Sequence, residues 1–353
     1  MKSYIAIAVF VCLGLLSAIL VGFHSRFGSE PLPYDDEQAE LGRDLVIKFS
    51  YVVAENTPKG QAAADFAKRV REKTNDRVKV ELFPNGMLFN EDNEVEALQH
   101  GSIQMIAPSF SNISSLSPPW LLMDLPFAFP SDDAVSEAFQ GDIGKRLMDL
   151  LERSNIVGLA FWENGFRQLT SSKGPIKTPE DLRNLRFRIQ PSRVIDAQYR
   201  TLGAETLALP FNQVYRSLEN GTVDGEENSI SNIYSKKLYQ VQDYLTLSNH
   251  SYLGYGVLMN KTFWDQLPPE LQRAISEAMA ETTIWANRNA RIINQKQWRE
   301  MQADSNLQVY ALSKDDQSHW RQLLQPVYDE FSPVIGRELM SDLERLQLKY
   351  AGK

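Results

Sequence analysis

The sequence predicts an α/β protein of two lobes, because short apolar strands alternate with amphipathic helices twice along the chain. The first set runs β-α-β-α-β over residues 45–107, and the second resumes after Gly141. This alternation is typical of a mainly parallel sheet covered by helices, with ligands bound at the carboxyl ends of strands. A charged stretch free of glycine and proline over residues 270–303 predicts a helix of about 50 Å that spans both lobes.

The first lobe begins with a strand over residues 45–53, whose alternating apolar residues predict one buried face. Thr57 and Pro58 then supply an N-cap and a first-turn proline for a helix. A strand over 78–83, a helix over 93–100 and a strand over 102–107 follow. Gly254-Tyr255-Gly256 lacks the third glycine of a dinucleotide loop, so we interpret it as a place where strands pack closely.

The second lobe begins with a helix after Gly141, and extended runs are predicted over 156–162 and, separately, 167–171. Thr178-Pro179 predicts a helix start, and residues 224–228 predict a turn. The remaining predictions are strands over 185–190, 245–249, 253–260 and 307–312, helices over 194–202 and 212–219, and two C-terminal helices.

The composition excludes several classes of function. Lys and Arg number 37 against 45 Asp and Glu, and the net charge of −8 offers no basic surplus for nucleic acid. The single cysteine, Cys12, lies in the first apolar run, so the body has no thiol for a disulfide, a nucleophile or zinc. We find no histidine pair for a metal, no nucleophile elbow and no phosphate loop, and we therefore expect no metal and no cofactor.

The N-terminus carries an apolar run without charge from Tyr4 to Phe23, about the length of a helix that crosses a bilayer. The run is longer than a signal-peptide core and no A-x-A site follows it, which favours a membrane anchor over a cleaved signal for residues 1–23. Residues 24–44 are acidic and contain two prolines, and they are interpreted as a linker. The body is therefore expected to be extracytoplasmic and tethered to the membrane.

Arginines give the clearest indication of chemistry. In the predicted strand over 185–190, Arg186 and Arg188 share one face. That basic face is either a solvated edge or the wall of a cleft, where a guanidinium can bind both oxygens of a carboxylate. Arg167 follows a strand end and is either a second cation of such a site or a surface residue. The residues alone leave these alternatives open.

Seven segments between about residue 47 and residue 339 carry a further pattern: KFSYVVAENTPKG (48–60), FPNG (83–86), EALQHG (96–101), FWENGFR (161–167), RIQPS (188–192), VDGEEN (223–228) and SNHSYLGY (248–255). Together they resemble the solute receptors of tripartite ATP-independent periplasmic (TRAP) transporters, in the C4-dicarboxylate branch. The most specific feature is a strand arginine followed 40 residues later by the Asn of D-G-x-E-N.

The resemblance implies a two-lobed, periplasmic-binding-protein-like fold whose lobes close on one small organic anion in the cleft between them. Lobe 1 is expected to comprise residues 45–163 plus about 251–290, and lobe 2 residues 164–250 plus about 291–353. The implied contacts are a salt bridge from Arg188 to the ligand carboxylate, a second basic position at Arg167, an amide contact from Asn228 and an aromatic wall at Phe211. Three further polar positions match less specifically, with capping of strand ends as the alternative role: Gln190, Ser192 and Ser109.

The implied function is a receptor without enzymatic activity that captures succinate, fumarate or malate outside the membrane. The expected partner is a TRAP-type or other dicarboxylate permease, or a C4-dicarboxylate sensor histidine kinase, and the body is expected to be monomeric. One alternative is a receptor for another small acid, such as a keto acid or a sugar acid. Another is an extracytoplasmic enzyme that uses Asp224 or Glu227 as a base on a carboxylate substrate.

Overall fold

The structure, a computed structural model, describes residues 45–351 of the 353-residue chain. The predicted membrane segment (1–23) and the acidic linker (24–44) lie outside the described residues. Between residues 45 and 351, no helix combines the length and the hydrophobicity needed to cross a membrane.

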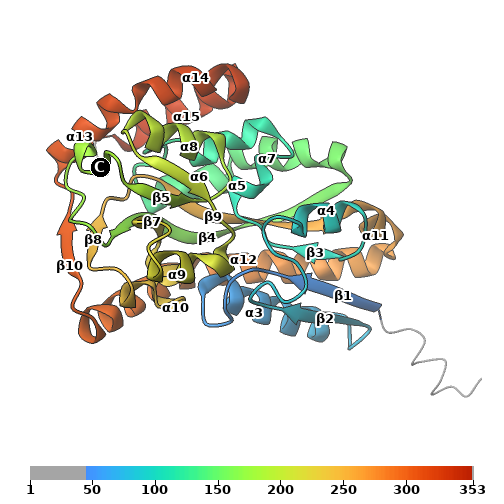
Figure 1. The fold of residues 1–353 in the computed structure, drawn as a ribbon. Coiled ribbons are helices and arrows are strands. Elements are labelled where there is room, and N and C mark those ends of the chain that lie inside the picture. The colour runs from blue at the N-terminus through green and yellow to red at the C-terminus, as the bar shows by residue number, and fades with distance from the viewer. Residues whose placement is uncertain (1–44, 352–353) are drawn as a thin grey trace, which may run out of the picture. The chain divides into compact units, whose positions relative to one another are not determined.

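A ten-stranded mixed sheet runs through the molecule in the order β2-β1-β3-β9-β4-β7-β5-β6, with β8 and β10 attached beside β4 (Figure 1). The prediction of a mainly parallel sheet is only partly correct, because β9 and β4 run antiparallel to their neighbours. The strands are β1 (Leu45–Ser50), β2 (Val78–Phe83), β3 (Met105–Ile106), β4 (Ile156–Ser171), β5 (Arg186–Ile189), β6 (Glu205–Ala208), β7 (Gly225–Ser229), β8 (Tyr244–Leu247), β9 (Tyr252–Asn260) and β10 (Gln308–Ala311).

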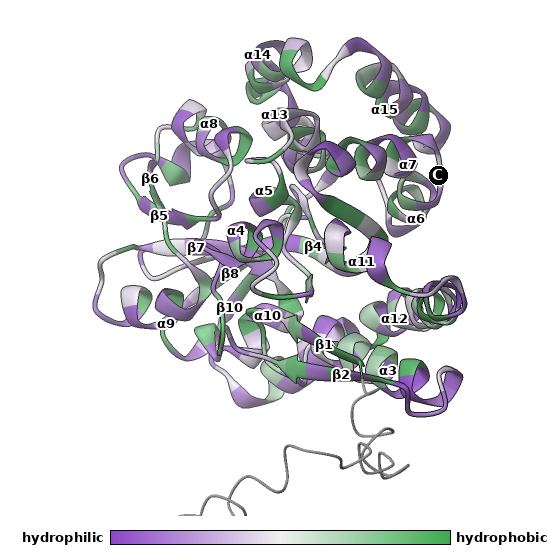
Figure 2. Ribbon diagram, turned by 90° about the vertical axis from the view of Figure 1, so that its right-hand side faces the viewer, coloured by the Kyte–Doolittle hydropathy of each residue, from purple (hydrophilic) through white to green (hydrophobic). Residues whose placement is uncertain are grey.

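Helices surround this sheet, and α14 and α15 carry hydrophobic and hydrophilic residues on different sides, as expected of helices that pack on a core (Figure 2). The α-helices are α3 (Pro58–Lys73), α4 (Glu94–Gln99), α5 (Phe110–Ile113), α6 (Asp132–Gln140), α7 (Asp142–Asp149), α8 (Arg193–Thr201), α9 (Phe211–Glu219), α10 (Ile230–Ser235), α11 (Lys261–Gln266), α12 (Pro269–Asp304), α13 (Lys314–Leu323), α14 (Gln325–Ile335) and α15 (Arg337–Tyr350). The 3-10 helices are η2 (Pro118–Asp124), η3 (Leu150–Ser154), η4 (Pro179–Leu182) and η5 (Leu238–Gln240).

Three predictions of local structure are wrong in their extent. Three helices follow β10 where two were predicted, because Gly336, with φ of 101°, separates α14 from α15. Thr178-Pro179 starts only the short 3-10 helix η4. The two extended runs predicted within 156–171 form the single strand β4, whose pairing with β9 is irregular beside Gly158 and Gly165.

Residues 225–229 form strand β7, so the turn predicted over 224–228 is wrong. Glu and Asn have low strand propensity, and the local sequence therefore favoured a turn. In the structure every residue of β7 is buried, and the strand pairs with β4 on one side and β5 on the other. The hydrogen bonds and burial supplied by these two neighbours outweigh the local preference.

The long helix is confirmed as α12, which has 36 residues. Near its middle, the Thr282 hydroxyl donates to Asp65 of α3. Three turns later, the Asn294 side chain accepts from the backbone of Ser231 in α10 and donates to the Asn164 carbonyl in β4. One helix therefore contacts segments that belong to both predicted lobes.

Candidate ligand-binding site

A cavity lies near the carboxyl ends of β1, β3, β5 and β7, where α/β sheets commonly bind ligands. It is nearly closed: about 280 Å³ is not filled by atoms when the open solvent at its mouth is counted, and only about 10 Å³ admits the centre of a water-sized sphere. Four of the residues that line it are predicted binding residues: Ser109, Gln190, Phe211 and Asn228. The other lining residues are Val52, Val53, Lys59, Glu91, Asn232, Leu253 and Tyr255.

Arg188 lies in β5, two residues before Gln190, and is not itself in contact with this cavity. Its side chain is 1% exposed. Nε and Nη2 donate to the Leu209 carbonyl at 2.9 and 2.6 Å, while Nη1 has no hydrogen-bond partner among the described residues. Burial lowers the pKa of Arg188, and the charges of Glu91 and Glu226 oppose this shift. A buried cation with an unused donor is suited to bind an anion.

Arg167, in β4, is equally buried; its two Nη atoms bind neighbouring side chains, while its Nε has no hydrogen-bond partner among the described residues. Its Nη1 lies 3.1 Å from Glu227 Oε1, and its Nη2 donates to Gln190 at 2.5 Å and to Ser111 at 3.3 Å. Glu227 balances the charge of Arg167. The bond to Gln190 places Arg167 behind a residue that lines the cavity.

Glu227 is the centre of a buried hydrogen-bond network. It accepts from the Tyr199 hydroxyl at 3.0 Å, and its Oε2 lies 2.7 Å from His250 Nε2. Burial raises the pKa of Glu227, but Arg167 and the His250 and Tyr199 hydrogen bonds outweigh it and lower the pKa to about 2. At neutral pH the carboxylate is therefore ionised and bound by Arg167, Tyr199 and His250. A general base would instead have a pKa near 7.

Asp224, the other acid considered as a base, binds the exposed Arg186. Arg186 Nη2 and Nε donate to the two carboxylate oxygens at 2.9 and 3.1 Å. This hydrogen bonding is the main reason that the pKa of Asp224 is lowered. Both candidate bases are thus held in ion pairs.

Amide side chains connect the polar wall of the cavity. Gln190 Nε2 donates to Ser109 Oγ at 3.0 Å. Asn228 donates to Glu226 at 3.1 Å and accepts from Asn232 at 2.8 Å. The structure therefore brings together Ser109, Gln190 and Asn228, whereas Ser192 lies at the N-cap of α8 and does not line the cavity.

Two charged residues of the cavity were not predicted from the sequence: Lys59 and Glu91. Lys59 is the second residue of α3 and is 1% exposed, although lysine is rarely buried without a partner. Glu91 Oε2 accepts from the backbone amide of Phe211 at 2.6 Å. Lys59 belongs to the KFSYVVAENTPKG segment (48–60), which predicts a helix start and contributes to the family resemblance but implies no ligand contact by Lys59.

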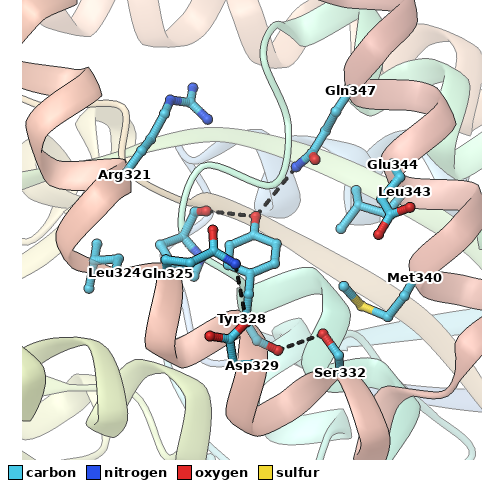
Figure 3. A pocket seen from close by; sticks show the side chains of 11 residues that line it. Arg321, Leu324, Gln325, Tyr328, Asp329, Ser332, Met340, Leu343, Glu344 and Gln347 are labelled. Atoms are coloured by element: carbon cyan, nitrogen blue, oxygen red, sulfur yellow. Dashed lines mark hydrogen bonds between the residues drawn. The ribbon is translucent and has the colours of Figure 1, made fainter.

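A larger cavity, with about 380 Å³ open to the centres of water-sized spheres, lies among α13, α14 and α15 (Figure 3). Its polar groups bind the neighbouring backbone: Tyr328 donates to the Pro126 carbonyl, and Arg321 donates to the Phe127 carbonyl. Asp329 and Glu344 line it together with Arg321, and none of the predicted binding residues does. Within residues 45–351, no group of three or more His, Cys, Asp or Glu side chains could hold a metal ion.

A two-lobed α/β fold with a small polar cavity at the strand ends defines a solute-binding protein. Residues 49–333 match the family described as bacterial extracellular solute-binding protein, family 7, and the chain belongs to that family. The family consists of extracytoplasmic binding proteins, not of enzymes.

Named relatives span nearly the whole chain. The C4-dicarboxylate-binding protein DctB of Bacillus subtilis is 46% identical over 98% of this chain and 99% of its own length. The C4-dicarboxylate-binding periplasmic protein DctP of Rhodobacter capsulatus is 41% identical over 85% of this chain and 90% of its own.

Solved structures share the fold. A TRAP periplasmic solute-binding protein of Sulfurospirillum deleyianum with bound succinate has a TM-score of 0.83 and 38% identity, and the match covers 86% of this chain and 99% of that one. Another, from Pseudomonas aeruginosa with bound L-malate, has a TM-score of 0.78 and 34% identity over 81% of this chain and 99% of that one.

Proposed function

We propose that this protein is an extracytoplasmic receptor for a C4-dicarboxylate such as succinate, fumarate or malate, which it binds and releases unchanged. The observation that carries the proposal is Arg188, a buried guanidinium whose Nη1 has no partner in the described chain. It is supported by the names of the relatives and by the succinate and malate in the similar structures. Arg188 binds one ligand carboxylate, and Asn228, Gln190 and Phe211 complete the site.

The size of the ligand explains why a guanidinium is needed. A C4-dicarboxylate has about eight heavy atoms, so micromolar binding, about −8 kcal/mol, requires about 1 kcal/mol from each atom. Contacts with so few carbons are too weak for this. A charge-assisted pair in a site without water is strong enough. Because the net charge of −8 repels a dianion, affinity comes from this local placement and not from long-range attraction.

The cavity walls suggest how the lobes close. Its lining residues from 45–163 and 251–290 are Val52, Val53, Lys59, Glu91, Ser109, Leu253 and Tyr255, and those from 164–250 are Gln190, Phe211, Asn228 and Asn232. These ranges are the two predicted lobes, so the cavity is the cleft between them. The hydrogen bond between Glu91 and the Phe211 amide joins the two sides. Lobe closure excludes water from the bound anion.

The receptor hands its ligand to a membrane partner, either a TRAP-type or other dicarboxylate permease or a dicarboxylate sensor kinase. Residues 1–23 tether it to the membrane, and the body acts as a monomer. Co-purification of the full chain from membranes with a candidate permease or kinase, with and without succinate, tests the partner. Recovery of residues 45–353 from the medium of intact cells would contradict the tether.

A calorimetric and thermal-shift screen of small acids tests the ligand, because binding to the folded state raises the melting temperature. Succinate, fumarate and malate are expected to bind. Galactonate belongs in the screen, because a 31% identical structure with TM-score 0.84 is a sugar-acid-binding protein in complex with it. Binding of sugar acids alone would overturn the C4 assignment, and chemical conversion of the ligand, followed by NMR, would overturn the receptor.

A further inference from the structure

Among the described residues that line the cavity, Lys59 is the one cation, and it belongs to the other predicted lobe than Asn228. It is the second residue of α3, within residues 45–163, whereas Gln190, Phe211 and Asn228 belong to residues 164–250. Its side chain lines the cavity and is 1% exposed.

The contacts of Lys59 leave its charge without a counterion. Nζ donates to the Ala107 carbonyl at 2.8 Å and lies 3.8 Å from the centre of the Tyr255 ring. An ammonium group has three N–H donors, and the carbonyl takes one of them. No carboxylate of residues 45–351 forms an ion pair with Nζ, although Glu91 and Glu94 lie near enough to influence its charge.

Among the described residues, neither of these two acids forms an ion pair with Lys59, although the charge of each opposes the fall in its pKa. Burial raises the pKa of Glu94, and the charge of Lys59 opposes this shift. The Glu91 carboxylate instead accepts the Phe211 amide hydrogen at 2.6 Å. Burial lowers the pKa of Lys59 to about 8, as expected of a cation that lacks a close partner. A buried ammonium in this state gains from an anion in the cavity.

We propose that Lys59 binds the second carboxylate of the ligand and thereby selects dicarboxylates over monocarboxylates of the same length. This inference rests on the proposed function of the cavity. One carboxylate pairs with Arg188 from the 164–250 side, and the other accepts hydrogen bonds from Lys59 on the 45–163 side. A monoanion leaves Lys59 buried without a counterion, so the site discriminates against it.

Calorimetry with succinate and succinamate tests this assignment, because succinamate has the same length and replaces one carboxylate by a neutral amide. The wild-type protein is expected to prefer succinate by about tenfold or more. Lys59→Met keeps the length of the side chain but removes its charge. We expect this variant to lose about tenfold or more in succinate affinity and less than about threefold in succinamate affinity.

Two further variants control for folding. Lys68→Met removes an exposed lysine from the same helix and is expected to keep the wild-type preference for succinate. Lys59→Gln retains a donor without the charge and repeats the test if Lys59→Met unfolds, as judged by circular dichroism.

The outcomes separate this inference from the proposed function. A wild-type protein that binds neither ligand overturns the proposed function, and this inference with it. If the wild-type protein binds succinate, the proposed function stands. The role of Lys59 alone is then overturned if the Lys59 variant still prefers succinate to succinamate, or if it loses affinity for both ligands equally. Loss of the preference alone supports it.

Discussion

Arg167 and Glu227, on adjacent antiparallel strands, form a fully buried ion pair with 3.1 Å between Nη1 and Oε1. Glu227 neutralises the charge of Arg167 within the protein. Arg188 lies on β5, which pairs with the β7 strand of Glu227, and among the described residues it has no carboxylate partner. The two arginines therefore act differently. Arg167 donates to Gln190, and Arg188 keeps its Nη1 donor without a partner among the described residues.

Arg188→Ala is expected to weaken succinate binding by about 2–5 kcal/mol, because it removes the main partner of a desolvated carboxylate. Isothermal titration calorimetry measures the loss. Arg186→Ala is the matched control on the same strand, since Arg186 is exposed and binds Asp224 instead. A loss of less than about threefold in Arg188→Ala would reject its role in binding.

Glu227→Ala is expected to destabilise the protein by about 3–5 kcal/mol, because it leaves Arg167 buried without its counterion. Urea denaturation at pH 7 measures this change, with the exposed Glu96→Ala as control. The lowered pKa, about 2 against an ordinary 4.5, means that Glu227 stabilises the folded state above pH 4.5 and loses this effect as the pH falls towards 2. The difference between wild type and variant should therefore shrink in acid, and a difference that is independent of pH would contradict the ion pair.

Glu226 is expected to make stability fall as the pH rises from about 4.5 to 7. Burial raises its pKa to about 7, with Arg188 and an Asn228 hydrogen bond opposing the shift. The folded state therefore binds the proton more tightly than the unfolded state, and unfolding releases it within this window. The shift corresponds to about 3 kcal/mol. Glu226→Gln should remove this slope from unfolding curves recorded between pH 4 and 8, and an unchanged slope would show that Glu226 is ionised throughout.

Gly254→Ala is expected to destabilise the protein by about 1–3 kcal/mol through overpacking. A Cβ at Gly254 would lie 2.5 Å from the Phe110 ring, which agrees with the close strand packing predicted from the sequence. Gly174→Ala is the control, because a Cβ there meets no atom within 4 Å. Equal melting temperatures for the two variants would show that Phe110 moves aside without cost.

Local sequence signals predicted many of the elements. The N-cap of α3 is Thr57, whose hydroxyl accepts from the Gly60 amide, followed by Pro58 as predicted. The strand over 78–83 and the long helix that becomes α12 also agree with the structure. Caps, prolines and hydrophobic periodicity act between residues close in the chain, so they can be recognised without a fold.

The sequence by itself thus determined the order of the main helices and strands, the lack of thiols in the body and the family resemblance that singled out Arg188 and Asn228. Only the tertiary structure decided that β7 is a buried strand, that Glu227 neutralises Arg167 and that Lys59 reaches the cavity. These outcomes depend on partners far apart in the chain, such as Lys59 with Ala107, 48 residues apart, and Arg167 with Glu227, 60 residues apart. Burial and charge pairing arise from neighbours in space, which the sheet brings together and which no local pattern encodes.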